Sequence, residues 1–366
     1  MKRIYVCVSN DVFGDNRVKK TCKSLKDYGL EVHIVCKRGK QNPQHKDTDF
    51  HFHPMRFLFK KNFLYYAELN IKILFMVLFK KIDILWANDL DTLFPMYIVS
   101  RLRRKPLIFD SHEMFTEIPE LNDNPKVKKF WQFLEKSMVP NLKWIITVCN
   151  PIKDYFKEKY NANAIVVRNI PLYNENNQQR KLYPLKEKII VWQGATNIDR
   201  SLEDLVLAMQ NIDAKLYIIG RGDVFHTLEK EIEENNLSEK VFLLGRKSFS
   251  EMMSYTRRAT IGLSIDRPTN GNYKISLPNK IFEYINAATP VLCTPLQEIK
   301  PIVKQYGTGD FIENPTKENL VDKINSMLND NETLQRMSDN CLKAQKELSW
   351  QNEEKHIFSL LDKILK

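Results

Sequence analysis

The 366-residue sequence lacks the short motifs by which many cofactor-binding and metal-binding proteins are identified. Neither half carries the glycine pattern G-x-G-x-x-G after its first expected strand, which argues against an NAD enzyme. The six cysteines include no C-x-x-C pair, so we expect free, buried thiols in a reducing compartment. No internal repeat of solenoid length is present either, which excludes a repeat protein.

The sequence also has no long uninterrupted apolar run. Residues 63–79 are strongly apolar, but Glu68 and Lys72 interrupt them, and the remaining run is too short to span a bilayer. The apolar run at residues 4–8 is too short for a secretory signal. These features predict a cytoplasmic protein.

Charge is distributed unevenly between the two halves of the chain. Residues 1–200 hold 35 Lys and Arg against 21 Asp and Glu, a formal charge of +14, whereas residues 201–366 carry −3. The basic half favours an anionic membrane, an anionic acceptor or nucleic acid. We expect no nucleic acid partner, because no nucleic-acid-binding motif accompanies the charge. Lysines at positions 60, 61, 80 and 81 flank residues 63–79, so this stretch predicts either a helix lying peripherally on the membrane or a helix packed on the N-terminal sheet.

Two short patterns contain metal-ligand residue types, and for both we expect no metal. His51 and His53 alternate along an expected strand, but no third ligand stands near them in the sequence. Asp89 and Asp91 form an Asp-x-Asp pair at the end of another expected strand, where carboxylates can bind a divalent cation. Asp91 is equally suited to cap a helix that begins at Thr92, which favours a structural role.

Short β-branched runs alternate with helical patterns in both halves, as in parallel sheets covered by helices. The expected strands are residues 4–9, 31–36, 82–87, 107–110, 144–148, 165–168, 189–193, 215–220, 241–245, 261–265 and 291–294. A polar stretch at residues 172–187 has the composition of a linker. We therefore expect the α/β class, with two Rossmann-like domains at residues 1–171 and 188–349 whose parallel sheets face a central cleft. A ligand is expected there, at the carboxyl ends of the strands.

The stretch at residues 270–290 carries the most chemical information. A polar loop leads from an expected strand into a helix that begins near Pro278 or Asn279, and free N–H groups at a helix start favour phosphate. Lys280 adds a positive charge in the first turn, and Glu283 lies one turn on, on the same face. A carboxylate can accept two hydrogen bonds from a ribose diol. The pair could therefore hold a nucleotide, or it could be an ion pair on a capped helix.

Two glycine-containing turns follow other expected strands of the second half. Gly194 can let the backbone approach a ligand. Arg200 falls near the start of the next helix, where a cation opposes the helix dipole unless a phosphate lies beside it; it could equally be a solvated surface residue. Gly220 begins a similar turn, Gly220-Arg221-Gly222.

In the first half, Asp110-Ser111-His112-Glu113 ends an expected strand, where α/β folds place functional side chains. His112 could be catalytic or structural. Asp15, Asn16 and Arg17 follow the first strand and could face an acceptor, although Asp15 could be only the N-cap of the following helix.

These stretches together resemble the retaining glycosyltransferases of family 4, which have the GT-B fold. Residues 276–284, Ser-Leu-Pro-Asn-Lys-Ile-Phe-Glu-Tyr, resemble the S-L-P-N-K-x-F-E-Y signature of one bacterial branch. The supporting matches lie at residues 15–17, 29–32, 110–113, 168–171, 193–194 and 220–222, so the resemblance covers nearly the whole chain. The last stretch is similar to the family's final helix, which implies that residues 350–366 cross back onto the N-terminal domain.

The resemblance implies that Glu283 holds the donor ribose, that Arg200 and Lys280 lie near the diphosphate, and that His112 lies near the transferred sugar. The implied donor set is Gln193, Gly194, Arg200, Gly220, Asn272, Ser276, Leu277, Pro278, Asn279, Lys280 and Glu283. The implied catalytic residues are His112, Arg200 and Lys280, and the implied acceptor side is Asp15, Asn16, Arg17 and Glu113.

The sequence departs from the family pattern at two positions. Ile275 stands where the larger branch has the first of two glutamates, so sugar contacts would come from the backbone of residues 276–277 or from Asn270 and Asn272. Ala195 stands where many members carry a phosphate-binding basic residue. Both departures leave the donor sugar open.

The implied reaction is a retaining, metal-independent hexosyl transfer from a UDP- or GDP-sugar to a glycan or lipid-linked acceptor in cell-surface polysaccharide synthesis. The nucleotide sugar is a substrate, and no resident cofactor is expected. Two alternatives remain at this stage. A nucleotide-sugar epimerase of the same fold would convert the donor alone, and a non-catalytic partner of another transferase would bind the donor without transfer or hydrolysis.

Overall fold

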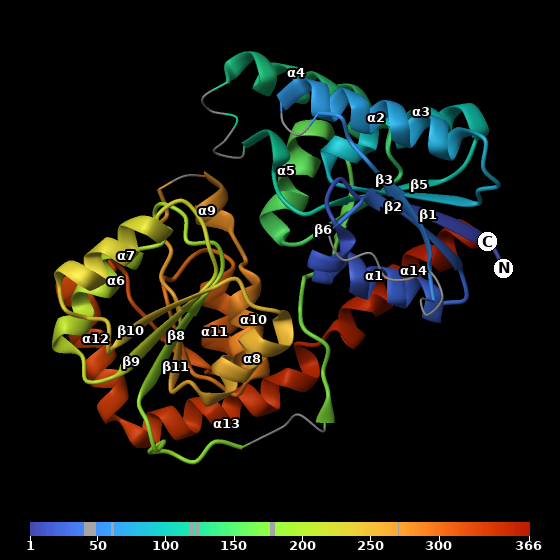
Figure 1. Cartoon of the computed structure of the whole chain (residues 1–366). Helices are drawn as coiled ribbons and strands as arrows, with labels where there is room; N and C mark the ends of the chain where they lie inside the picture. The colour runs from blue at the N-terminus through green and yellow to red at the C-terminus, as the bar shows by residue number, and fades with distance from the viewer. Residues whose placement is uncertain (40–48, 60–61, 118–120, 122–123, 176–179, 270) are drawn as a thin grey trace. The chain divides into compact units, whose positions relative to one another are not determined.

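The computed structural model describes residues 1–39, 49–59, 62–117, 121, 124–175, 180–269 and 271–366. The chain folds into two compact units, one formed by Met1–Asn169 together with Glu353–Lys366 and the other by Ile170–Asn352. Each unit contains a parallel β-sheet with helices packed on it (Figure 1). The prediction of an α/β fold with two Rossmann-like domains is confirmed.

The first unit contains a seven-stranded parallel sheet in the order β3-β2-β1-β4-β5-β6-β7. Its strands are β1 Arg3–Cys7, β2 Glu31–Lys37, β3 His51–Met55, β4 Ile84–Asn88, β5 Leu107–Ser111, β6 Trp144–Thr147 and β7 Ala164–Val166. Its helices before the interdomain segment are α1 Asn16–Asp27, α2 Asn62–Leu78, α3 Leu90–Arg103, α4 Pro125–Met138 and α5 Asn150–Tyr160. The central strands β4 and β5 are buried along their whole length, as parallel strands covered by helices require.

The second unit contains a six-stranded parallel sheet in the order β10-β9-β8-β11-β12-β13. Its strands are β8 Ile189–Gln193, β9 Lys215–Ile219, β10 Val241–Gly245, β11 Ile261–Ser264, β12 Val291–Cys293 and β13 Gly309–Phe311. Its helices are α6 Leu202–Ala208, α7 Phe225–Glu234, α8 Phe249–Arg258, α9 Gly271–Ile275, α10 Asn279–Asn286, α11 Ile299–Tyr306, α12 Lys317–Asn329 and α13 Asn331–Glu347.

The last helix, α14 (Trp350–Leu365), packs on the first unit. In α1, the Ser24 hydroxyl donates a hydrogen bond of 2.5 Å to Glu354. Lys2 Nζ donates to the carbonyl of Leu365 at 3.3 Å, so the two ends of the chain lie side by side (Figure 1).

The helix that carries the family-like signature begins where the sequence predicts. Pro278 is the N-cap of α10, and the first helical residue is Asn279. Tyr284 fixes this helix to the sheet, because its hydroxyl donates to the Leu263 carbonyl at 3.0 Å. Gly262 leaves room for the ring, since a Cβ there would lie 2.6 Å from Tyr284. Residues 280 and 283 are therefore held at a fixed position relative to β11.

Of the two helix caps predicted in the first unit, one is confirmed and the other is wrong. Asp15 caps α1 and accepts hydrogen bonds from the backbone N–H groups of Arg17 and Val18 at 3.1 and 3.0 Å. The prediction that Asp91 caps the next helix is wrong, because α3 already begins at Leu90. The N-cap lies two residues earlier, at Asp89, whose φ is 58°, and Asp91 is buried within the first helical turn.

The cysteines and the apolar stretches agree with their sequence-based expectations. All six cysteines are buried and free, which confirms that the chain uses them as packed thiols. In the part of the chain that the structure describes, no helix has the length and hydropathy needed to cross a bilayer.

Candidate functional site

A cluster of polar and charged side chains in the second unit lies at the carboxyl ends of β8, β9 and β11. Three segments meet there: residues 194–201 after β8, residues 220–224 after β9, and residues 265–269 and 271–278 between β11 and α10. In open parallel sheets this edge is where ligands bind.

Glycines allow the first two loops to approach each other. Gly194 and Gly220 have φ values of 134° and 147°, which favour glycine. The Gly194 N–H donates to the Ile219 carbonyl at 3.0 Å, and a Cβ on Gly220 would lie 1.6 Å from the Gly194 carbonyl oxygen. Both glycines are therefore required by backbone packing, whatever the loops bind.

A fully buried carboxylate, Asp266, joins the two predicted phosphate-binding cations. Asp266 follows β11 and is 0% exposed. Its Oδ2 accepts a hydrogen bond from Nη1 of Arg200, and its Oδ1 lies 3.4 Å from Nζ of Lys280. Two cations share one carboxylate, so this cluster of three side chains keeps a net positive charge when both are protonated.

Lys280 is 6% exposed and lies over the ring of Trp192, with Nζ 4.4 Å from the ring centroid. Burial, together with the neighbouring Arg200 charge, lowers the pKa of Lys280 to about 8, although the attraction of Asp266 opposes this shift. The ammonium group therefore loses its proton as the pH rises through about 8.

The loop that carries Arg200 is tied to the loop after β11. Asp199 accepts hydrogen bonds from Thr269 Oγ1 at 2.7 Å and from the Arg267 N–H at 2.8 Å. The residues on either side of Arg200, Asp199 and Ser201, have φ values of 66° and 54°, a conformation that costs energy outside glycine. The two loops together hold the guanidinium, whose carbon lies 4.6 Å from the Tyr273 ring centroid.

Several polar atoms of the same loop are buried without a hydrogen-bond partner in the part of the chain that the structure describes. They are Thr196 Oγ1, Arg200 Nε and Ser201 Oγ. Buried polar atoms are usually paired, so a small region with three unpaired ones fits a site that receives its hydrogen bonds from a ligand.

Glu283 lies one turn beyond Lys280 and is half-buried. It accepts a hydrogen bond from the side-chain amide of Gln193. The other end of that amide accepts from Thr256 Oγ1 at 2.8 Å. Thr256 therefore orients Gln193, and Gln193 orients the Glu283 carboxylate.

The segment between β11 and α10 presents the remaining predicted donor residues. Asn272 lies in the short helix α9, and Ser276, Leu277 and Pro278 link it to α10. The Ser276 hydroxyl donates to the Tyr273 carbonyl at 3.1 Å. Asn270 lies outside the described residues.

A second charged cluster lies in the first unit, at the ends of β4 and β5. The carboxylate of Asp89 accepts a hydrogen bond from the His112 N–H at 2.8 Å and lies 3.1 Å from Nδ1 of the same residue. Nε2 of His112 lies 3.4 Å from Asp110. Burial alone would lower the pKa of His112, but the charges of Asp89 and Asp110 outweigh it and raise the pKa to about 10. His112 is therefore an imidazolium at neutral pH.

The residues expected on the acceptor side have different environments. Arg17 is 4% exposed, and its guanidinium donates to Asp110 at 2.7 Å and to the Val167 carbonyl at 2.8 Å. These hydrogen bonds give Arg17 a structural role inside the unit, and its place on the acceptor side stays a prediction. Asn16 is half-buried and Glu113 is exposed.

The sequence patterns did not identify Asp266 as a site residue, and they did not predict that Asp89 pairs with His112. Asp89 directly follows β4, and Asp266 lies two residues after β11, so the strand-end position that singled out His112 could have indicated both. The side chains that pair with Asp89 and Asp266 come from other loops and from α10, so these pairs could not be predicted from the sequence.

Two family models cover the chain in succession. Residues 15–171 match the model described as Glycosyltransferase Family 4, and residues 174–344 match Glycosyl transferases group 1. An uncharacterized glycosyltransferase of Methanocaldococcus jannaschii is 27% identical over 224 residues, which are 60% of this chain and 59% of that protein. The match thus spans less than two thirds of that relative's length.

Solved structures share the fold over the whole chain. A glycosyltransferase from Rickettsia africae has a TM-score of 0.76 at 16% identity, with 100% of this chain and 99% of that chain covered. Anabaena HepE, solved in complex with UDP and glucose, has a TM-score of 0.74 at 12% identity, with 99% and 100% covered. Together with the two parallel sheets, this similarity shows the GT-B fold.

Proposed function

Because this chain carries both domains of a GT-B glycosyltransferase, we propose that it transfers a sugar from a nucleoside-diphosphate sugar to a glycan or lipid-linked hydroxyl acceptor. The observation that carries the proposal is the convergence of Arg200 and Lys280 on Asp266, with Glu283 one turn beyond. Two cations suit a diphosphate, and a half-buried carboxylate suits a ribose diol. HepE, which shares the fold, was solved with UDP and glucose.

In the proposed reaction the acceptor oxygen bonds to the anomeric carbon while the bond from that carbon to the diphosphate breaks. The acceptor attacks from the side of the leaving group, so the configuration is retained and the departing phosphate oxygen takes the acceptor proton. Arg200, Lys280 and the N-terminus of α10 stabilise the charge that develops on the diphosphate. This role needs no metal ion, and we infer a metal-independent hexosyl transfer in cell-surface polysaccharide synthesis.

His112 is proposed to act as a fixed positive charge rather than as a general base. Its pKa of about 10 keeps both ring nitrogens protonated at neutral pH. Asp89 and Asp110 hold the ring in place from two sides. Such a preorganised cation can stabilise negative charge on a substrate without rearranging during the reaction.

The proposal is tested first by screening UDP- and GDP-sugars in a thermal-shift assay, since a ligand that binds only the native state raises Tm. A sugar that raises Tm is then incubated with glycan and lipid-linked acceptors. Transfer with retained configuration supports the proposal. Conversion of the donor alone supports an epimerase, and binding without transfer or hydrolysis supports a non-catalytic partner.

Glu283→Ala should weaken the binding of nucleoside mono- and diphosphates by a similar factor, roughly 10–100-fold, because both carry the ribose and a charged hydrogen bond contributes about 1.5–3 kcal/mol. Calorimetry with nucleoside, monophosphate and diphosphate measures the three affinities. Glu233→Ala, at an exposed carboxylate near the end of α7 in the same unit, is the control and should bind like the parent. Unchanged nucleotide binding by a natively folded Glu283→Ala would place the donor elsewhere.

The first unit presents a surface suited to an anionic membrane. One face of α2 packs inside the unit through Leu69, Ile73 and Val77, which are all fully buried. This burial favours the predicted packing of the helix within the N-terminal domain. Apolar side chains are exposed on the other face of α2 and just after its end, with Phe75 64% and Phe79 78% exposed. The basic residues Arg56, Lys72 and Lys80 line the hollow beside them. We propose that this face attaches the enzyme peripherally to the membrane that holds a lipid-linked acceptor.

The double variant Phe75→Ser, Phe79→Ser should reduce co-sedimentation with anionic vesicles at low salt by roughly tenfold or more, because each phenylalanine buried in the interface contributes about 1.5–3 kcal/mol. Phe249→Ser removes a partly exposed phenylalanine from the second unit and should leave sedimentation unchanged. If the parent chain does not sediment with these vesicles, the membrane proposal is rejected.

A further inference from the structure

Three ligand-type side chains meet at the amino ends of β2 and β3, away from the strand ends that carry the clusters described above. They are Glu31 and His33 of β2 and His51 of β3, and their donor atoms all lie within 4.8 Å of one another. His33 and Glu31 are two residues apart on one face of a strand, and His33 is the register partner of His51. The strand pairing therefore supplies the further ligands that the sequence around His51 and His53 lacks.

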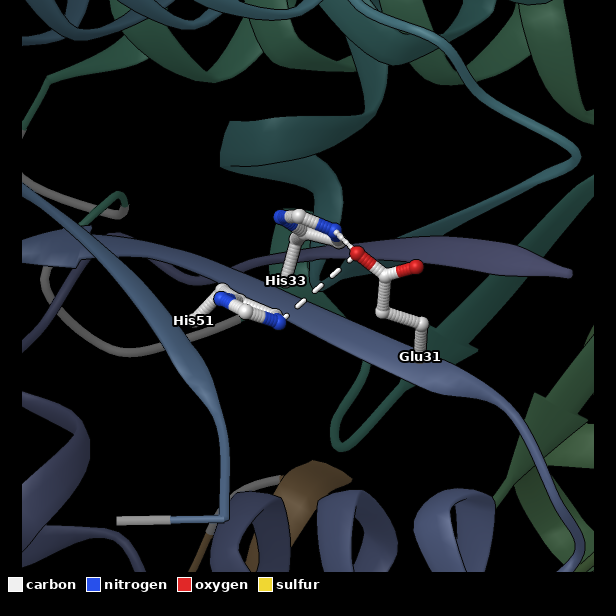
Figure 2. Close-up of side chains that lie close together, drawn as sticks. All are labelled: Glu31, His33 and His51. Carbon is white, nitrogen blue, oxygen red and sulfur yellow. Dashed lines mark hydrogen bonds and ion pairs between the residues drawn. The ribbon is translucent and has the colours of Figure 1, made fainter. Parts of the chain in front are cut away.

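The donor atoms converge on one carboxylate oxygen. Oε1 of Glu31 lies 3.0 Å from Nε2 of His33 and 3.7 Å from Nε2 of His51, and Figure 2 shows both imidazoles facing this oxygen. Ligand atoms bound about 2.1 Å from a tetrahedral ion lie roughly 3.4 Å from one another. Of the two distances from Glu31 Oε1, the one to His33 is shorter than 3.4 Å and the one to His51 is longer. His51 is 60% exposed along its side chain, so its ring can turn toward an ion.

The surrounding residues orient two of the three ligands. Arg3 Nε donates to the other carboxylate oxygen, Oε2, at 3.0 Å, which leaves Oε1 directed at the imidazoles. Nδ1 of His33 lies 3.0 Å from Nε2 of His53, and a proton on Nδ1 leaves the lone pair of His33 Nε2 for an ion. The Tyr5 ring stacks on His33 at 4.5 Å between centroids. Such outer contacts are the usual support of metal-bound histidines.

We propose that Glu31, His33 and His51 bind a divalent transition metal ion of the zinc class. Two imidazole nitrogens and one carboxylate oxygen suit zinc better than magnesium or calcium, which prefer all-oxygen sites. The ion would link β3, an edge strand of the sheet, to β2. The ion would lie at the amino ends of the strands, opposite the strand ends that carry His112 in the same sheet.

Calorimetric titration of the chelator-treated full-length chain with zinc chloride tests the proposal. We expect saturable binding of one zinc ion, no binding of magnesium under the same conditions, and a higher Tm with zinc. His51→Ala and Glu31→Gln should each weaken zinc binding by at least tenfold and abolish the rise in Tm. Because His51 is largely exposed, its variant should keep the parent's circular dichroism spectrum.

The matched control is His226→Ala. His226 is an exposed histidine beside a carboxylate, with Nδ1 2.6 Å from Glu229, but a single such pair lacks the third ligand. Its variant should bind zinc like the parent. Absence of saturable zinc binding, or binding that survives His51→Ala unchanged, would overturn the proposal. Zinc is measured directly, so neither result depends on whether the chain transfers sugar.

Discussion

Lys280→Met should lower the rate of sugar transfer by roughly 10²–10³-fold, the loss typical when one preorganised donor to a developing negative charge is removed. The lysine is buried beside Asp266 and over Trp192, so a leaving diphosphate meets its charge in a low-dielectric environment. Methionine has a similar length and removes the charge together with the N–H donors of the lysine. Steady-state kinetics with the donor found by screening measures the effect on kcat and on kcat/KM.

The pH dependence of donor binding gives this prediction a second readout. Because the pKa of Lys280 is lowered to about 8, the ammonium form that attracts a diphosphate is lost as the pH rises through 8. The donor affinity of the parent should therefore be highest below pH 8 and fall above it, whereas that of Lys280→Met should lack this decline. Binding is followed by calorimetry between pH 7 and 9.

Lys304→Met is the matched control, because Lys304 is an exposed lysine in α11 of the same unit. It should transfer sugar at the parent rate. A Lys280→Met enzyme that keeps the parent rate, while folding normally, would show that this lysine only balances the charge of Asp266. The donor diphosphate would then have to bind away from α10.

Arg17→Met should destabilise the first unit by about 3–5 kcal/mol, the cost of removing one partner of a buried ion pair. Arg17 and Asp110 are 4% and 0% exposed along their side chains and 2.7 Å apart. The substitution leaves the buried Asp110 carboxylate with His112 as its remaining charged neighbour and removes the hydrogen bond to Val167. Urea unfolding followed by hydrogen exchange, which distinguishes the two units, measures the loss.

Arg180→Met supplies the comparison for this prediction. Arg180 and Asp339 form an ion pair of similar length, 2.8 Å, but their side chains are 61% and 29% exposed, and exposed pairs contribute about 0–1 kcal/mol. The two variants should therefore differ by several kcal/mol in the free energy of unfolding. An Arg17→Met chain that is as stable as Arg180→Met, but impaired in acceptor use, would contradict this structural role and support the predicted acceptor-facing one.

The sequence by itself determined the elements that depend on local patterns. Alternating β-branched runs and helical patterns predicted two parallel-sheet domains, because such runs are buried on both faces wherever they pair. Pro278 and Asn279 indicated the start of α10, and Asp15 indicated a cap of α1, since these residues act within one helical turn of their own position.

The tertiary structure alone decided which charged groups share a partner. Arg200, Asp266 and Lys280 come from two loops and a helix, and Arg17 meets Asp110 across 93 residues. Glu31, His33 and His51 meet only because β2 and β3 pair in one register. The partners of a side chain, its burial and its pKa are set by strand order, register and loop closure. These are properties of the assembled sheet, which no window of the sequence contains.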